Sequence, residues 1–147
     1  MKHGVFPKIH PTCHRQSSQY FTVFISSWGW SGKVPAWAEF QLASNQALEE
    51  LTIFTGLGWG LTKNHITSFK MTAKREGLWV DLENVWVKNA SEAVIKTDGT
   101  VTLSQPQDRL DLMFDQVDQV SAIKLTVLDA YGDSNYGTVT ELLVPCK

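Results

Sequence analysis

Two loop-like stretches of the sequence mix aromatic rings with short polar side chains, a combination suited to sugar recognition. The first, GWGLTKNH, covers residues 58–65, and the second, DAYGDSNYG, covers residues 129–137 between two apolar runs. A pyranose has faces rich in C–H groups and a rim of hydroxyls. An aromatic ring can therefore cover the face while amide, carboxylate or amine groups bond the hydroxyls. Ordinary polar loops would have a similar composition, and both interpretations stay open at this point.

Catalytic and metal-binding signatures are weak by comparison. His10, Cys13 and His14 lie close together, but no second ligand pair follows them, whereas a zinc site needs about four ligands. The sequence has no Gly-x-Ser-x-Gly nucleophile elbow, phosphate-binding loop, dinucleotide fingerprint or His-Glu-x-x-His motif. We therefore predict that the chain is not an enzyme.

The composition narrows the class of protein and of partner. A chain of 147 residues fits one domain with a real core. The net charge of −2 at pH 7 argues against a nucleic-acid partner, which usually requires a basic surface. No apolar run reaches the ~18 residues that indicate a transmembrane helix, and the N-terminus lacks the apolar segment of a signal peptide. If the protein is exported, which the sequon Asn89-Ala90-Ser91 hints at, its signal lies outside this sequence.

The two cysteines, Cys13 and Cys146, lie near opposite ends of the chain. The termini of single domains often lie close together, so a disulfide between these residues is one interpretation. Two unpaired thiols are the other, and the residues alone leave both open.

Short runs of alternating apolar and polar residues, separated by turn signals, predict a protein built of β-strands. Ile123, Leu125 and Val127 alternate with polar residues, and this period of two is typical of a strand with one buried face. The expected strands are residues 20–26, 37–43, 48–55, 65–74, 78–82, 84–89, 92–97, 100–104, 109–114, 121–129 and 138–144. No long helix is available to build parallel βαβ units, so we predict a sandwich or jelly roll.

Other signals refine this outline. The Asp-Gly turn in TDGT, residues 97–100, predicts a hairpin. Residues 44–51 and 114–120 form two weak helical windows, each too short to be stable alone. A change in composition near residue 19 divides the chain into an N-terminal arm, residues 1–19, and a single β-sandwich domain, residues 20–147.

The tryptophans fall into two groups. Trp28, Trp37 and Trp79 lie in or beside expected strands, and we predict that they pack in the core. Trp59, in a glycine-rich loop, and Trp30, in WGWSGK, either plug an end of the sandwich or expose a ring for recognition.

The closing part of the sequence, AIKLTVLDAYGDSNYGTVTELLVPC, resembles the last strands of discoidin-type domains. These are also called coagulation factor 5/8 C-type or galactose-binding-like domains, and they include many carbohydrate-binding modules. WAEFQL, at residues 37–42, resembles an earlier strand of these domains, and residues 51–77 resemble the strand, loop and strand that follow it. The resemblance covers roughly residues 26–146. It implies an all-β jelly-roll β-sandwich of two antiparallel sheets.

The resemblance also implies site residues. Ligands of that family bind at loops on one end of the sandwich, and the matching residues here are Trp59, Lys63, Asn64, Tyr131, Asp133, Asn135 and Tyr136. Many carbohydrate-binding members hold a structural calcium, for which Glu141 matches one ligand. The early calcium-binding segment is altered, because SSW at residues 26–28 lacks the Asp-Gly that precedes it in the family. A paired cysteine at each end is common in extracellular animal members and matches Cys13 and Cys146.

The expected function is a non-catalytic, lectin-like module that binds a glycan or glycoprotein. The resemblance implies a secreted or extracellular protein that is part of a larger multidomain protein or of an oligomer. The alternative on the same fold is a protein–protein interaction, assembly or cell-surface adhesion module, whose exposed aromatics would form a hydrophobic hot spot. A small enzyme would need a catalytic constellation that the sequence does not display.

Overall fold

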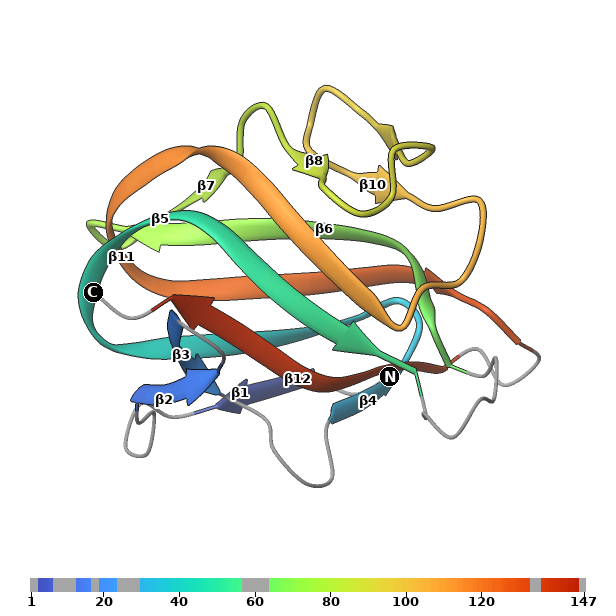
Figure 1. Ribbon diagram of the computed structural model, residues 1–147, viewed down its shortest axis with the longest axis horizontal. Coiled ribbons are helices and arrows are strands. Elements are labelled where there is room, and N and C mark those ends of the chain that lie inside the picture. The colour runs from blue at the N-terminus through green and yellow to red at the C-terminus, as the bar shows by residue number, and fades with distance from the viewer. Residues whose placement is uncertain are drawn as a thin grey trace.

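The chain folds as an all-β sandwich in the computed structural model (Figure 1). The structure describes residues 3–6, 13–16, 19–23, 30–56, 64–132 and 136–145, with the backbone path alone up to Trp30. Within these residues there is no α-helix, and accordingly none that is long and apolar enough to cross a membrane.

Two long strands, β5 (Ala36–Thr55) and β11 (Arg109–Ala130), form the frame of the fold. They pair antiparallel twice, once between Ala36–Gln41 and Ala122–Val127 and once between Glu50–Phe54 and Arg109–Met113. Between the two ladders the register shifts repeatedly, as expected where β-bulges bend a strand. Each strand therefore runs through both layers of the sandwich and joins them at one side.

The first layer combines the first half of β5 with the second half of β11 and the strands beside them. β6 (Ile66–Arg75) continues the layer next to β11, and β7 (Leu78–Asp81) and β10 (Val101–Thr102) pair with β6. β9 (Val94–Ile95) pairs with β10. β1 (His3–Phe6) pairs with β5 in parallel, whereas the other strand pairs among the described residues are antiparallel.

The second layer combines the second half of β5 with the first half of β11. β12 (Tyr136–Pro145) lies beside β5, and β8 (Trp86–Val87) lies on the other side, beside β11. β3 (Gln19–Val23) and β4 (Trp30–Lys33) both pair with β12, and β2 (Cys13–Gln16) pairs with β3. β12, the last strand of the chain, thus lies beside strands from the first half of the sequence.

The core fills the space between the layers with alternate side chains of these strands. Phe40 and Leu125 from the first layer and Ile53, Leu110 and Leu142 from the second are fully buried. Burying one such side chain stabilises the fold by about 1.5–3 kcal/mol. The period of two at Ile123, Leu125 and Val127 therefore predicts that strand and its inner face correctly.

The hairpin predicted from TDGT is confirmed. β9 and β10 pair antiparallel across it, and Gly99 adopts a φ of 90°, which suits glycine. The Thr100 amide donates a hydrogen bond to Asp98 Oδ1 (3.0 Å). Hydrogen bonds from the Thr100 backbone and then its side chain lower the pKa of the exposed Asp98 carboxyl.

The two helical windows are wrong. Residues 44–51 belong to β5 and residues 114–120 to β11, where Val117 is opposite Leu48 and Val120 is opposite Gln46. The apolar residues of each window recur irregularly because the strand bends there, and this irregular spacing mimics a helical period.

The core assignment of the tryptophans also needs correction. Trp37 and Trp79 are half-buried, and neither belongs to the core between the layers. The Lys124 amine lies 5.4 Å from the centre of the Trp37 ring and 4.9 Å from that of Trp79. Both rings therefore cover a lysine on the outside of the first layer, in cation–π geometry. Trp28 and Trp59 lie outside the described residues, and for Trp30 the structure describes the backbone path only.

Candidate functional site

One end of the sandwich brings together the two loops that the sequence singles out. β5 ends at Thr55, β6 begins at Ile66, β11 ends at Ala130 and β12 begins at Tyr136. In the strand registers Ala130 is opposite Ile66 and Val139 is opposite Thr55, so the four strand ends meet (lower right in Figure 1). We call this end of the molecule the rim.

Three of the predicted ligand-binding residues lie at the rim. The Asn64 amide donates a hydrogen bond to the Tyr131 carbonyl (3.1 Å), and the Thr138 amide donates to the Asn64 carbonyl (2.9 Å). These bonds tie the β5–β6 loop to both sides of the β11–β12 loop. Tyr131 is 47% exposed and Tyr136 is 42% exposed. The rim thus presents two aromatic rings to solvent, one on each side of the second loop.

A buried histidine, which the sequence reasoning missed, fixes a carboxylate at the rim. His65 is 2% exposed, and its Nε2 lies 2.7 Å from Oδ1 of Asp108, whose side chain is 86% exposed. The Thr55 amide donates to the Asp108 carbonyl (2.9 Å), and the Tyr131 amide donates to the His65 carbonyl (2.8 Å). No motif links His65 to Asp108, which is 43 positions away, so only the fold reveals the pair.

Gly56 leaves room for the imidazole ring of His65. Its φ of +93° is a left-handed conformation, and a Cβ built on it would lie 2.5 Å from Cε1 of His65. The Gly56 amide also donates to the Thr138 carbonyl (3.0 Å). The imidazole ring therefore packs directly against the glycine backbone, in space that a side chain would occupy.

Several predicted residues cannot be placed. Among the predicted site residues and cysteines, those that lie outside the described part of the chain are Trp59, Lys63, Asp133, Asn135 and Cys146. For Cys13 the structure describes the backbone of β2 alone, so the predicted disulfide lies outside the described residues as well.

Glu141, the predicted calcium ligand, lies in the middle of β12. It is half-buried and stands opposite Phe54 of β5. Calcium takes about six to eight oxygen ligands, but no group of three or more His, Cys, Asp and Glu in the described part of the chain could hold a metal ion. The second segment implied for calcium, residues 26–28, falls outside that part. The residues described around Glu141 do not by themselves fit a calcium site.

Solved carbohydrate-binding domains share this architecture. A family 32 carbohydrate-binding module of a family 31 glycoside hydrolase, bound to N-acetylgalactosamine (GalNAc), is similar with a TM-score of 0.55 and 16% identity over 88% of this chain and 78% of that one. A family 32 module from Clostridium perfringens, in complex with galactose, gives a TM-score of 0.51 and 14% identity over 85% and 77% of the two chains. The F5/8 type C domain of a Bacteroides fragilis protein gives 0.50 and 13% over 76% and 64%. The predicted galactose-binding-like jelly roll is thus confirmed as the fold.

The same fold occurs inside larger proteins. A protein described as an alpha-L-fucosidase, from Bacteroides thetaiotaomicron, is similar with a TM-score of 0.51 and 14% identity over 80% of this chain. This chain spans 21% of the length of that protein. No protein-family model matches the sequence, and no curated protein matches it.

Proposed function

We propose that this chain is a non-catalytic module that binds glycans at the rim. The observation that carries the proposal is the pair of exposed tyrosines, Tyr131 and Tyr136, beside the strand ends, close to the fixed carboxylate of Asp108. Structures of the same fold bound to GalNAc and to galactose support a sugar as the ligand.

Each rim group has a role that follows from its chemistry. A tyrosine ring packs against the C–H-rich face of the sugar, since aromatic rings supply apolar area at low entropic cost. Asp108 accepts a hydrogen bond from a sugar hydroxyl through the oxygen that His65 does not use. In the proposal the loop residues Trp59, Lys63, Asp133 and Asn135 complete the site.

The sugar that we propose is a galactose-configured pyranose, galactose or GalNAc. Its axial 4-hydroxyl leaves a continuous C–H patch on the opposite face of the ring, which suits one aromatic side chain. Binding is expected to be weak, because a monosaccharide offers few atoms and its hydroxyls must lose water. Several modules or several ligands would then be needed for tight adhesion.

For this function we infer a location outside the cell and covalent linkage to further domains. The likeness to one part of a longer alpha-L-fucosidase supports the linkage. A calcium ion at Glu141 would require ligands from outside the described residues.

Isothermal titration calorimetry with galactose, GalNAc and glucose tests the proposal. We expect millimolar binding of the first two sugars, and Tyr131→Ala and Tyr136→Ala should each weaken it at least about fivefold, which is about 1 kcal/mol. Leu78→Ala is the matched control, because Leu78 is 70% exposed on β7 and is opposite Arg75, at the end of β6 that is far from the rim. Absence of heat with all three sugars, or equal affinities in the tyrosine and control variants, would contradict rim binding.

A further inference from the structure

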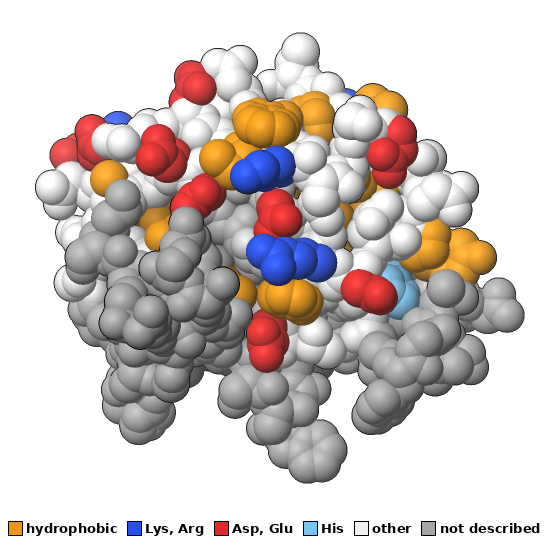
Figure 2. Space-filling view, viewed as in Figure 1, with side chains coloured by type: hydrophobic (Ala, Val, Ile, Leu, Met, Phe, Trp, Pro, Cys, Tyr) orange, Lys and Arg blue, Asp and Glu red, His pale blue; other side chains and the backbone are white. Residues whose placement is uncertain are grey.

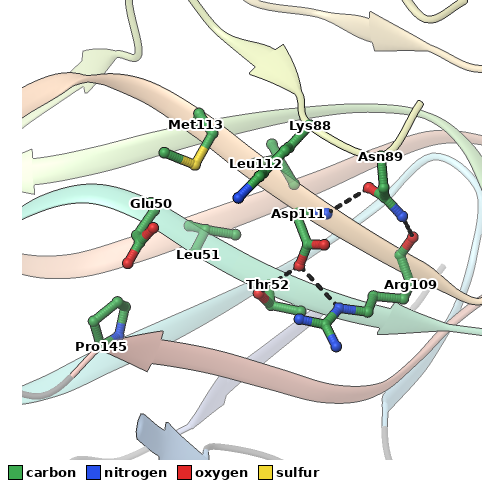
Figure 3. A pocket seen from close by; sticks show the side chains of 10 residues that line it. All are labelled: Glu50, Leu51, Thr52, Lys88, Asn89, Arg109, Asp111, Leu112, Met113 and Pro145. Atoms are coloured by element: carbon green, nitrogen blue, oxygen red, sulfur yellow. Dashed lines mark hydrogen bonds and ion pairs between the residues drawn. The ribbon is translucent and has the colours of Figure 1, made fainter. Parts of the chain in front are cut away.

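A hollow lies on the outer face of the second layer, away from the rim loops. It has a volume of about 360 Å³, within the range of ~300–1,000 Å³ typical of small-ligand sites. Figure 3 shows the side chains that line it: Glu50, Leu51, Thr52, Lys88, Asn89, Arg109, Asp111, Leu112, Met113 and Pro145. We call it the groove.

The outward-facing residues of β5 and β11 build the groove in cross-strand pairs. Asp111 is opposite Thr52, and Met113 is opposite Glu50. Leu110 and Leu112 of β11 are buried in the core, so Asp111 between them must face outward. The alternation that forms the core thus also lines this surface with polar and charged groups.

Hydrogen bonds hold the polar groups of the groove in place. Asp111 Oδ1 accepts from Thr52 Oγ1 and from Arg109 Nε, both at 2.9 Å (Figure 3). Asn89 Oδ1 accepts from the Asp111 amide (3.0 Å), and Asn89 Nδ2 donates to the Arg109 carbonyl (2.7 Å). The Arg109 guanidinium lies 5.5 Å from the centre of the Phe54 ring. The arginine and the aspartate are therefore preorganised.

The same bonds give Asn89 a structural role. Its side chain uses both amide atoms to pin the turn after β8 to β11. Asn89, the first residue of the sequon at residues 89–91, therefore links this turn to β11.

An exposed aromatic ring stands at one end of the groove. Trp86 of β8 is opposite Met113, and directly paired residues project to the same side of a sheet. Trp86 is 51% exposed, whereas its neighbour Val87 is buried in the core. Lys88, two residues along, projects to the same outward side as Trp86. Figure 2 looks onto this face and shows basic and acidic side chains alternating along a line, with hydrophobic side chains at both ends.

The charges of the groove indicate what it can hold. Lys88 and Arg109 balance Glu50 and Asp111, so the groove favours neither an anion nor a cation. Among the described residues, the second oxygen of Asp111 and the terminal guanidinium nitrogens of Arg109 have no hydrogen-bond partner. An adjacent acceptor and donor pair of this kind matches the neighbouring hydroxyls of a sugar.

The length of the surface sets the size of the ligand. Arg109 and Met113 are four residues apart on β11, which corresponds to roughly 13 Å in a strand and to roughly two or three linked pyranose rings. We propose that the groove is a second binding site, for a neutral linear oligosaccharide that stacks on Trp86 and bonds its hydroxyls to Asp111 and Arg109. This site does not depend on the rim site.

NMR titration of the ¹⁵N-labelled full chain with neutral linear hexasaccharides of glucose, mannose, galactose and N-acetylglucosamine tests the proposal, with oligogalacturonate as the acidic comparison. At least one neutral hexasaccharide should shift the Trp86 indole and Arg109 Nε signals, and Trp86→Ala should weaken its binding at least about fivefold. Leu78→Ala, another exposed apolar residue, and Tyr131→Ala, at the rim, should leave that affinity unchanged.

Three results would overturn the groove proposal. The first is that no neutral hexasaccharide shifts the Trp86 signal at about 10 mM, a concentration that detects even weak binding. The second is that only oligogalacturonate shifts it. The third is that a hexasaccharide binds but Trp86→Ala has no effect, whereas Tyr131→Ala abolishes binding, which would assign the ligand to the rim. Failure of galactose to bind at the rim would leave the groove result unaffected.

Discussion

At the scale of single residues, the rim depends on contacts that leave no room for a side chain. Gly56 packs against the ring of His65, and His65 in turn holds Asp108. The sequence marks Gly56 only as part of a glycine-rich loop, and it shows His65 as a lone histidine without a partner. The identity of the partner is encoded by the strand pairing, which brings together residues far apart in the chain.

Gly56→Ala should therefore destabilise the fold strongly. The substitution adds a Cβ about where the imidazole lies and forces alanine into a left-handed conformation, which alone costs about 1–2 kcal/mol. Gly77→Ala is the control for the conformational part, because Gly77 has a φ of +79° and nothing lies within 4 Å of its added Cβ. Urea denaturation should show a loss of free energy of unfolding at least ~1 kcal/mol larger for Gly56→Ala than for Gly77→Ala. Equal losses would mean that the His65 ring moves aside easily.

At the scale of elements, the sequence predicts the straight parts of the strands and fails at their bends. The alternation around Ile123, Leu125 and Val127 extends through one half of β11 and is easy to recognise. Between Met113 and Ala122 the register shifts break that alternation, and the same residues look weakly helical. β11 stays extended through the bend because it pairs with β5 on both sides of it. This continuity depends on tertiary contacts, so the local sequence does not predict it.

The bend of β11 contains a residue whose conformation suits glycine. Gln119 has a φ of 58°, which is strained for a residue with a side chain. Gln119→Gly should relieve about 1 kcal/mol of strain and so leave stability unchanged or slightly higher, despite the added freedom of the unfolded chain. Gln116→Gly, at an exposed position of the same strand with ordinary φ, should lower the free energy of unfolding by about 1 kcal/mol. If thermal unfolding shows the same loss for both variants, Gln119 is not strained by the bend.

Aromatic residues show the same division between what a pattern predicts and what packing decides. Strand position places Trp37 and Trp79 correctly in the sheet, yet the structure puts them on its outer surface over Lys124. Alternate residues of a strand face opposite sides of the sheet, so the position of a residue along the strand decides which face it occupies. A large apolar residue on the outer face looks like a core residue in the sequence, because both are hydrophobic. For this reason the sequence alone does not identify Trp86 as a site residue, although its pairing with Met113 places it beside a polar groove.

At the scale of the whole molecule, the two surfaces that we propose for glycan binding are separate from each other. The rim lies where β5, β6, β11 and β12 end or begin, whereas the groove lies on a sheet face between β5, β11 and β8. The resemblance to discoidin-type domains and the composition of the two loops predict the rim, because the order of the strands decides which loops lie at one end of the sandwich. The groove arises from alternating residues on three strands that are not consecutive, so it could be found only in three dimensions.

The most direct test of glycan recognition at the rim is a crystal structure of the chain soaked with GalNAc. We predict a pyranose ring in contact with the face of Tyr131 or Tyr136, with a hydroxyl within hydrogen-bonding distance of Asp108. A sugar bound only at another surface, or a rim without sugar at concentrations that saturate binding in solution, would contradict it.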